Sequence, residues 1–263
     1  MRSRRARLLA GLFVCVIAGI TAVGSMVARA ATPQKPAISE EATSALAHMG
    51  ATLQAKQFSF EARTLRVYSN QNGDLLHIAH RFKVTMRRPD RLLVDGTGDD
   101  GPRKLVYDGK TATLVLDDGK KYASLPVPNT IQGMMHVVVG HFGVDFPLAD
   151  FLTEAPSKSF LTGVVSGHQV NTVTIDGVPC RHFVFFQPPK MELELWLEDN
   201  ERSLPRRLIV TYRSLPGEPN FVAEMSDWNF TVDPPDAEFQ FEPAQGAERL
   251  QFGAALRPAT GAK

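Results

Sequence analysis

The sequence from 191 to 241, MELELWLEDNERSLPRRLIVTYRSLPGEPNFVAEMSDWNFTVDPPDAEFQF, decides the fold. Its first eight residues alternate between apolar side chains and a series of glutamates with one tryptophan, a period of two that is typical of a half-buried strand. The apolar positions of this strand are Met191, Leu193, Leu195 and Leu197. Two more alternating runs follow after turn sequences, which predicts antiparallel hairpins in series with one dry face and one solvated face.

The third alternating run changes parity partway along. Apolar residues occupy odd positions up to Met225 and even positions from Trp228 onward. A strand whose apolar side chains all face one core needs an extra residue at such a change. The pattern therefore predicts a β-bulge near Ser226 and Asp227.

Helices and further strands precede this stretch. Ser39 to Lys56 predicts an amphipathic helix with Ser39 as its N-cap. Asn129 to His141 predicts a helix that is apolar nearly all round and begins with a capping box formed by Asn129 and Gln132. A turn and a short helix are expected over 146–152. Further strands are predicted over 58–69, 75–88, 91–97, 104–108, 111–116, 121–125, 160–166, 169–175 and 180–187.

The beginning of the chain is typical of an export signal. Four arginines among the first seven residues precede an apolar stretch from Leu8 to about Val23, and Ala28-Arg29-Ala30 fits a small-x-small cleavage site. We expect residues 1–30 to be a signal peptide that is cleaved before Ala31. The alternative is an uncleaved membrane anchor, and the export route, Sec or twin-arginine, is left open.

Charge and cysteine content narrow the function classes. The chain has 29 basic and 28 acidic residues, and the predicted signal contains five arginines and no acids, which leaves 24 against 28, a net charge near −4. A nucleic-acid partner is therefore not expected. Of the two cysteines only Cys180 follows the signal, which excludes an internal disulfide and zinc sites built on two or four cysteines.

Known motifs do not predict a catalytic site. Residues 96–101, GTGDDG, match the dinucleotide-binding pattern G-x-G-x-x-G, but Pro102 and another strand follow where a helix would be required, so we predict a hairpin loop. The histidines lack metal-ligand spacing. We therefore predict no enzyme activity, no metal site and no cofactor. The alternative, a hydrolase, would need polar residues that converge from separate loops.

The apolar content of the middle of the chain suggests a binding cavity. The chain has sixteen phenylalanines, and the helix predicted from Asn129 pairs two methionines with a valine run. We predict a large apolar cavity between this helix, acting as a lid, and the sheet. The alternative is that these residues simply pack the helix on the sheet. The predicted lid residues are Met134, Met135, Val138 and Phe142, and the opposing wall is Leu193, Leu195 and Leu197.

Several short segments give the chain a family resemblance. They are Arg88-Pro89-Asp90-Arg91-Leu92, Tyr107-Asp108-Gly109-Lys110, Phe146-Pro147-Leu148-Ala149-Asp150, Trp196-Leu197, Leu204-Pro205, Asp227-Trp228 and Phe239-Gln240-Phe241-Glu242-Pro243. With them the chain resembles a family of predicted periplasmic proteins, domain of unknown function 2092, and more broadly the periplasmic lipoprotein-carrier fold. The resemblance implies a mainly β (α+β) fold, a half-open antiparallel β-barrel of about ten or eleven strands with helices covering the concave face.

These expectations combine into one domain organisation and one function. Residues 31–37 are expected to be a flexible leader, 38–252 a single carrier-like domain and 253–263 a tail. The expected function is a periplasmic binding or carrier protein for a lipid acyl chain or another hydrophobic molecule, with transient membrane contact. The alternative is a cell-envelope sensor or protein-interaction module that uses the same groove to bind an envelope protein.

Overall fold

The structure is a computed structural model that describes residues 37–142 and 146–255. The predicted signal peptide, 1–30, lies outside the described residues. So do most of the predicted leader, 31–37, and of the predicted tail, 253–263.

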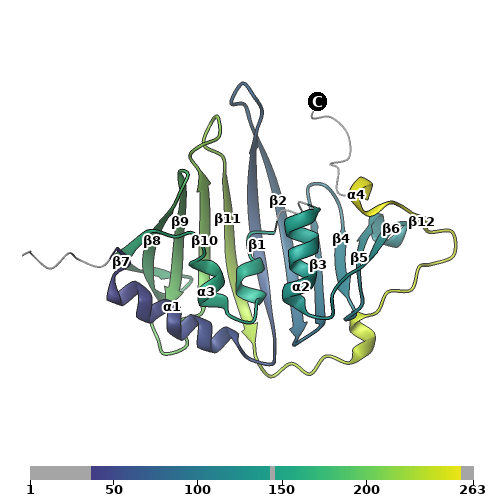
Figure 1. Ribbon diagram of the computed structural model, residues 1–263, viewed down its shortest axis with the longest axis horizontal. Helices are drawn as coiled ribbons and strands as arrows, with labels where there is room; N and C mark the ends of the chain where they lie inside the picture. The colour runs from purple at the N-terminus through teal and green to yellow at the C-terminus, as the bar shows by residue number, and fades with distance from the viewer. Residues whose placement is uncertain (1–36, 143–145, 256–263) are drawn as a thin grey trace, which may run out of the picture. The chain divides into compact units, whose positions relative to one another are not determined.

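Twelve strands form one sheet in the order β12-β6-β5-β4-β3-β2-β1-β11-β10-β9-β8-β7 (Figure 1). The first six are β1 (Gln57–Ser69), β2 (Leu75–Arg87), β3 (Arg91–Gly98), β4 (Arg103–Tyr107), β5 (Thr111–Leu116) and β6 (Lys121–Pro126). The others are β7 (Ser166–Ile175), β8 (Val178–Gln187), β9 (Met191–Glu198), β10 (Pro205–Tyr212), β11 (Asn220–Asn229) and β12 (Glu248–Arg249). Neighbours pair antiparallel except β12 and β6, which are parallel.

The sheet is open, since its order ends at β7 and β12 and the described strands include no pairing between these two. The mainly β class predicted from the sequence is confirmed, with twelve strands in place of about ten or eleven. Closure into a half-open barrel stays a prediction. The strand β12 has two residues, too few for an alternation signal in the sequence.

The third alternating run contains the predicted bulge. Ser59 of β1 pairs with Asn229 of β11, whereas Glu61 pairs with Ser226, so β11 has one residue more than β1 over this interval. Asp227 takes a φ of 55° there. The extra residue turns the Trp228 ring onto the core side, where it stacks on Phe60 with centroids 4.3 Å apart.

The first helix begins as the sequence predicts. Helix α1 (Glu40–Leu53) has Ser39 as its N-cap, and the Ser39 hydroxyl accepts a hydrogen bond of 3.2 Å from the backbone N–H of Ala42. The predicted capping box at Asn129 is wrong. Helix α2 (Ile131–Met135) is capped by Thr130, whose hydroxyl accepts from Gly133 N–H at 3.0 Å.

Short helical turns complete the chain. A π-helical turn η2 (His136–His141) continues α2. The others are η1 (Asp117–Gly119), η3 (Ala149–Leu152), α3 (Pro156–Phe160), η4 (Asp236–Phe239) and α4 (Phe252–Ala255). The strand predicted over 160–166 is wrong, because Pro156 begins α3 and β7 starts only at Ser166. A proline at the first helical position favours a helix, and this local signal prevails over the short apolar alternation that follows.

Helices α1, α2 and α3 lie on the same face of the sheet (Figure 1). The main core lies between them and the strands, and includes Leu46 and Met49 of α1 with Phe58 and Phe60 of β1. A small second cluster of Ile175, Cys180 and Trp196 lies apart from that core.

Candidate functional site

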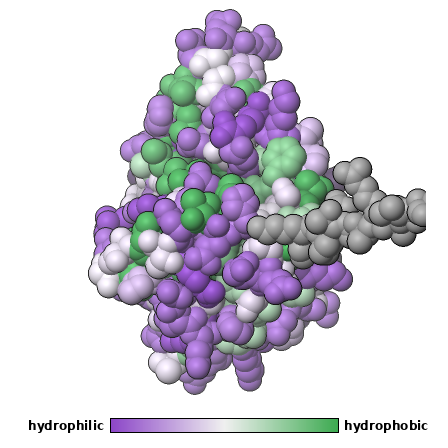
Figure 2. Space-filling view, turned by 90° about the vertical axis from the view of Figure 1, so that its left-hand side faces the viewer, coloured by the Kyte–Doolittle hydropathy of each residue, from purple (hydrophilic) through white to green (hydrophobic). Residues whose placement is uncertain are grey.

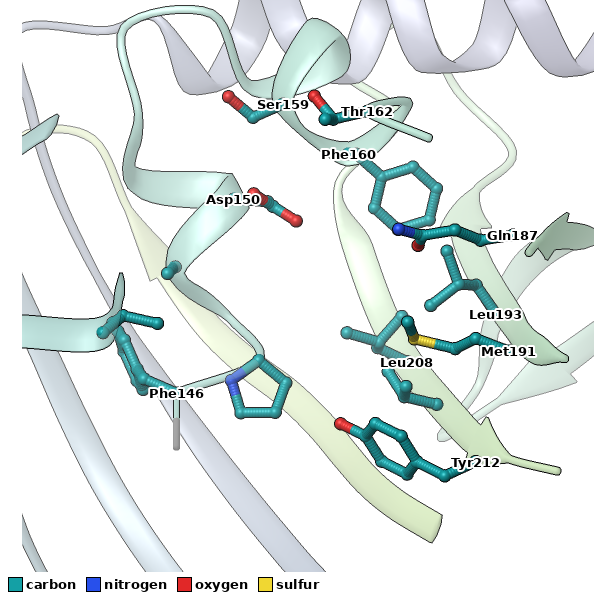
Figure 3. Close-up of a pocket in the computed structure, with 14 residues that line it drawn as sticks. Phe146, Asp150, Ser159, Phe160, Thr162, Gln187, Met191, Leu193, Leu208 and Tyr212 are labelled. Atoms are coloured by element: carbon teal, nitrogen blue, oxygen red, sulfur yellow. The ribbon is translucent and has the colours of Figure 1, made fainter. Parts of the chain in front are cut away.

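A pocket of about 470 Å³ opens between the helical segment that follows α2 and strands β8 to β10 (Figure 3). The sheet contributes Gln187, Met191, Leu193, Leu208, Val210 and Tyr212. The helical segment contributes Val139 from η2, then Phe146, Pro147, Ala149 and Asp150, and finally Ser159, Phe160 and Thr162 from α3 and the turn after it. Most of these side chains are apolar, so the pocket is suited to a hydrophobic molecule.

The sheet wall follows from strand register. Met191 of β9 pairs with Tyr212 of β10, and Leu193 pairs with Val210. Successive strand residues point to opposite faces, so residues two apart on β9 meet residues two apart on β10 on one side. This places a continuous apolar surface beneath the helical segment.

The opposite wall is held by a partly buried arginine. Arg88, which follows β2, donates from Nη1 to the carbonyl oxygen of Leu152 in η3 at 3.0 Å and from Nη2 to that of Leu53 in α1 at 2.9 Å. Phe160 of α3 packs edge-on against Phe185 of β8, with ring centroids 5.3 Å apart. These contacts fix η3 and α3 over the sheet with room for the pocket between them.

Asp150 is the one charged residue among the described residues that line the pocket. Its carboxylate points into the space between the two walls (Figure 3). Burial raises the pKa of the Asp150 carboxyl above its ordinary value. Within residues 37–142 and 146–255, no hydrogen-bond donor or cation is paired with this carboxylate.

Three other polar side chains of the lining, Ser159, Thr162 and Tyr212, are already engaged. The Ser159 hydroxyl lies 2.8 Å from that of Thr153, and the Thr162 hydroxyl donates to the carbonyl oxygen of Lys158 at 3.1 Å. At the other end, the Tyr212 hydroxyl accepts from Arg66 Nη1 at 3.1 Å. Within the described lining, the side chains of Asp150 and Gln187 have no hydrogen-bond partner, and Asp150 is the charged one.

Of the seven residues predicted to line a cavity, Leu193 lines this pocket. Met134, Met135, Val138, Leu195 and Leu197 are packed in the core and at most 5% exposed. Phe142 is half-buried and packs edge-on against Phe252, with centroids 5.2 Å apart. Contact of these six residues with a ligand stays a prediction.

Sequence reasoning missed Asp150, Val210 and Tyr212 as lining residues. The alternation of β10 gave a signal for Val210 and Tyr212, since both share the apolar parity of Leu208. Asp150 belonged to one of the segments that carry the family resemblance, but no sequence signal predicted it as a pocket residue, because the burial of one carboxylate depends on how η3 is placed.

The described residues offer neither a cluster of metal ligands nor a membrane-spanning helix. No group of three or more histidine, cysteine, aspartate or glutamate side chains among them is placed to hold a metal ion. None of the helices in 37–142 and 146–255 is long and apolar enough to cross a membrane.

The fold and pocket define a class: a mainly β protein with one large open sheet, helices on one face and an apolar pocket beneath them. The chain belongs to a family of predicted periplasmic proteins, domain of unknown function 2092, whose model matches residues 42–253. The family resemblance seen in the sequence is thereby confirmed.

Similar solved structures are more distant. An uncharacterized conserved protein from Thermus thermophilus is 10% identical, with 81% of this chain and 99% of that one covered and a TM-score of 0.48. The lipoprotein LppX of Mycobacterium tuberculosis is 16% identical, with coverage of 74% and 99% and a TM-score of 0.44. A LolA superfamily protein from Nitrosomonas europaea is 11% identical, with coverage of 76% and 97% and a TM-score of 0.38. No curated protein matches the sequence.

Proposed function

We propose that this protein binds or carries a lipid or another hydrophobic molecule in the periplasm, held in the pocket between β8–β10 and the segment from η2 to α3. The observation that carries the proposal is the pocket itself, about 470 Å³ and walled mainly by apolar side chains. This volume lies within the roughly 300–1,000 Å³ that is usual for small-molecule sites. Each buried methylene of a ligand would contribute about 0.8 kcal/mol, so an acyl chain needs few polar contacts.

The proposed role is binding and not catalysis. Asp150 is the one carboxylate of the described lining, and the same lining contains no histidine, lysine or second acid next to it. General acid–base chemistry usually pairs such groups. A hydrophobic surface with a single carboxylate supports recognition of a ligand better than its conversion.

The proposal includes export with removal of residues 1–30. Export is supported by the family to which the chain belongs, because its members are described as predicted periplasmic proteins. Intact-mass measurement of the protein from a periplasmic extract tests this part. A chain that begins at Ala31 is expected, and a full-length chain that stays with the membrane fraction would contradict it.

Native mass spectrometry with lipid extraction tests the binding function. The protein is purified from the periplasm without detergent, so that a bound molecule is retained. We expect a reproducible extra mass that extracts into organic solvent as a lipid. A clean protein mass that stays unchanged after incubation with membrane lipids would contradict the proposal.

A matched pair of variants assigns the extra mass to the pocket. Met191 lines the pocket and is partly exposed, so Met191→Glu places a carboxylate in the apolar wall and is expected to abolish the extra mass. Leu76 is 56% exposed at the start of β2, and Leu76→Glu makes a similar apolar-to-acidic change outside the pocket. Retention in the Leu76 variant and loss in the Met191 variant support the assignment, whereas equal retention rejects it.

The alternative function, an envelope sensor or protein-interaction module, is favoured by a different surface. Hydrophobic residues are exposed among hydrophilic ones on the side of the molecule that ends in β7 (Figure 2). Val165 and Val170 are each 50% exposed there, and β7 is the last strand of the sheet, although its Gly167 already bonds to Ala37 and Ser39. An extended peptide can add to such an edge. A stable complex with an envelope protein in a periplasmic pull-down, without bound lipid, would favour this function over the carrier.

A further inference from the structure

The unpaired carboxylate in the pocket constrains the kind of ligand. Asp150 belongs to η3, which is held by Arg88 through the Leu152 carbonyl at 3.0 Å. The backbone carbonyl of Asp150 is bonded to the Thr153 hydroxyl at 3.1 Å, so the turn itself is fixed. The turn that presents the side chain to the pocket is therefore fixed, and the carboxylate is directed into the space between the two walls (Figure 3).

A carboxylate in an apolar wall is costly unless a donor satisfies it. Burying a charged group without a partner is among the most unfavourable arrangements in a protein, and hydrogen bonds to ionised groups are about twice as strong as neutral ones. The described residues supply no such donor to Asp150. A ligand that brings its own donor would gain this interaction, and an anionic ligand would meet repulsion.

Arg66, which contacts one lining residue, does not change this conclusion. Arg66 lies at the opposite end of the pocket from Asp150, behind Tyr212, and does not line the pocket. Its guanidinium lies over the Tyr212 ring at 4.7 Å and near the Phe221 ring at 5.9 Å. Arg66 is thus engaged by aromatic side chains and is not among the residues that line the pocket.

We propose, on the basis of the binding function above, that the pocket prefers an apolar molecule whose polar end is a hydrogen-bond donor directed at Asp150, a protonated amine above a hydroxyl, and that it discriminates against an anionic end. The ligand class is therefore a long-chain amine or alcohol and not a free fatty acid. The apolar chain lies along Met191, Leu193 and Val210, and the donor reaches the η3 side.

Three probes with the same chain test this preference: decylamine, decanol and decanoate. The full mature protein is stripped of endogenous ligand, loaded with the neutral fluorescent probe N-phenyl-1-naphthylamine, and titrated with each compound at neutral pH. We expect decylamine to displace the dye at a concentration roughly tenfold below that of decanol, the difference that one charge-assisted hydrogen bond makes. Decanoate is expected to be the weakest of the three.

Asp150→Asn assigns the preference to this side chain. Asparagine keeps the volume and removes the charge, so the preference of decylamine over decanol should disappear while decanol binding changes by less than roughly twofold. Asp118→Asn makes the same change at an exposed residue of η1 outside the pocket and should leave all three titrations unchanged.

The outcomes separate the two proposals. If neither the dye nor any of the three compounds binds, the binding function fails. If the compounds bind without discrimination, if decanoate binds tightest, or if Asp150→Asn keeps the amine preference, the binding function stands and the assignment to Asp150 is wrong.

Discussion

The guanidinium of Arg88 and the carbonyl oxygen of Leu152 form a hydrogen bond of 3.0 Å between residues that are 64 positions apart. The same guanidinium also donates to the carbonyl oxygens of Leu53 at 2.9 Å and Ala55 at 3.3 Å. One side chain at the end of β2 thus joins the end of α1 to η3. The pocket depends on this junction, because η3 carries Asp150.

Replacing Arg88 should destabilise the fold. Arg88→Met leaves three carbonyl groups without their charged donor, and we expect the free energy of unfolding to fall by at least about 2 kcal/mol, since hydrogen bonds to charged groups contribute about 1.5–3 kcal/mol each. Burial lowers the pKa of Arg88, so relief of its desolvation offsets part of the loss. Urea denaturation measures the difference.

Two further variants control for loss of charge and of hydrogen bonds at Arg88. Arg63→Met removes an arginine from an exposed position on β1 and should change the free energy of unfolding little. The free energy of unfolding of Arg88→Lys should lie between the values of the wild type and Arg88→Met. One ammonium group cannot reach all three carbonyl oxygens, as the planar guanidinium does. Equal urea midpoints for Arg88→Met and Arg63→Met would show that the junction contributes nothing.

Removing the Asp150 charge should raise stability at neutral pH. Burial raises the pKa of the folded-state carboxyl, so between the unfolded-state and folded-state pKa values the folded protein binds more protons, and stability falls as pH rises through that window. Asp150→Asn is therefore expected to melt at a higher temperature than the wild type at neutral pH, with a gain that shrinks below the ordinary pKa of an aspartate. Thermal scans of both ligand-free proteins, from neutral pH to below the ordinary pKa of an aspartate, measure this difference in melting temperature. A difference that grows as the pH falls would contradict the prediction.

Gly96 should not accept a side chain. A Cβ at this position on β3 would lie 2.5 Å from the Arg81 carbonyl oxygen and closer still to the Phe82 ring on the paired strand β2. We expect Gly96→Ala to lower the free energy of unfolding by about 1–3 kcal/mol, as overpacking does. At Gly140 of η2 the nearest atom to an added Cβ is His136 Nδ1 at 3.8 Å, so Gly140→Ala should be neutral or stabilising by up to about 1 kcal/mol. Similar losses in both variants would contradict the steric explanation.

Met134 should tolerate a change of shape but not a charge. Its side chain is 0% exposed in the core between α2 and the sheet. Met134→Asp buries an unpaired carboxylate and should cost several kcal/mol, enough to unfold part of the population. Met134→Leu keeps volume and polarity and should cost less than about 1.5 kcal/mol. Chemical denaturation followed by circular dichroism measures the stability of both variants. A Met134→Asp protein that is fully folded and as stable as the wild type would show that the site is accessible to water.

The local structure of this protein was largely readable from its sequence. Alternation from Met191 onward gave β9 to β11, the change of parity before Trp228 gave the bulge, and Ser39 gave the start of α1. Each of these signals lies within one element and its adjacent turn. Side-chain period, capping hydroxyls and turn residues act over such short distances, so they need no knowledge of the rest of the fold.

Tertiary structure alone decided the site. Pairing of β1 with β11 places Ser59 beside Asn229, and the Arg88 junction places η3 over the sheet, neither of which any local pattern specifies. The burial of Asp150 beside the pocket follows from the placement of η3. Contacts between distant segments are selected by the summed packing and hydrogen bonding of the whole core, and the environment of a single carboxylate exists only once that packing is complete.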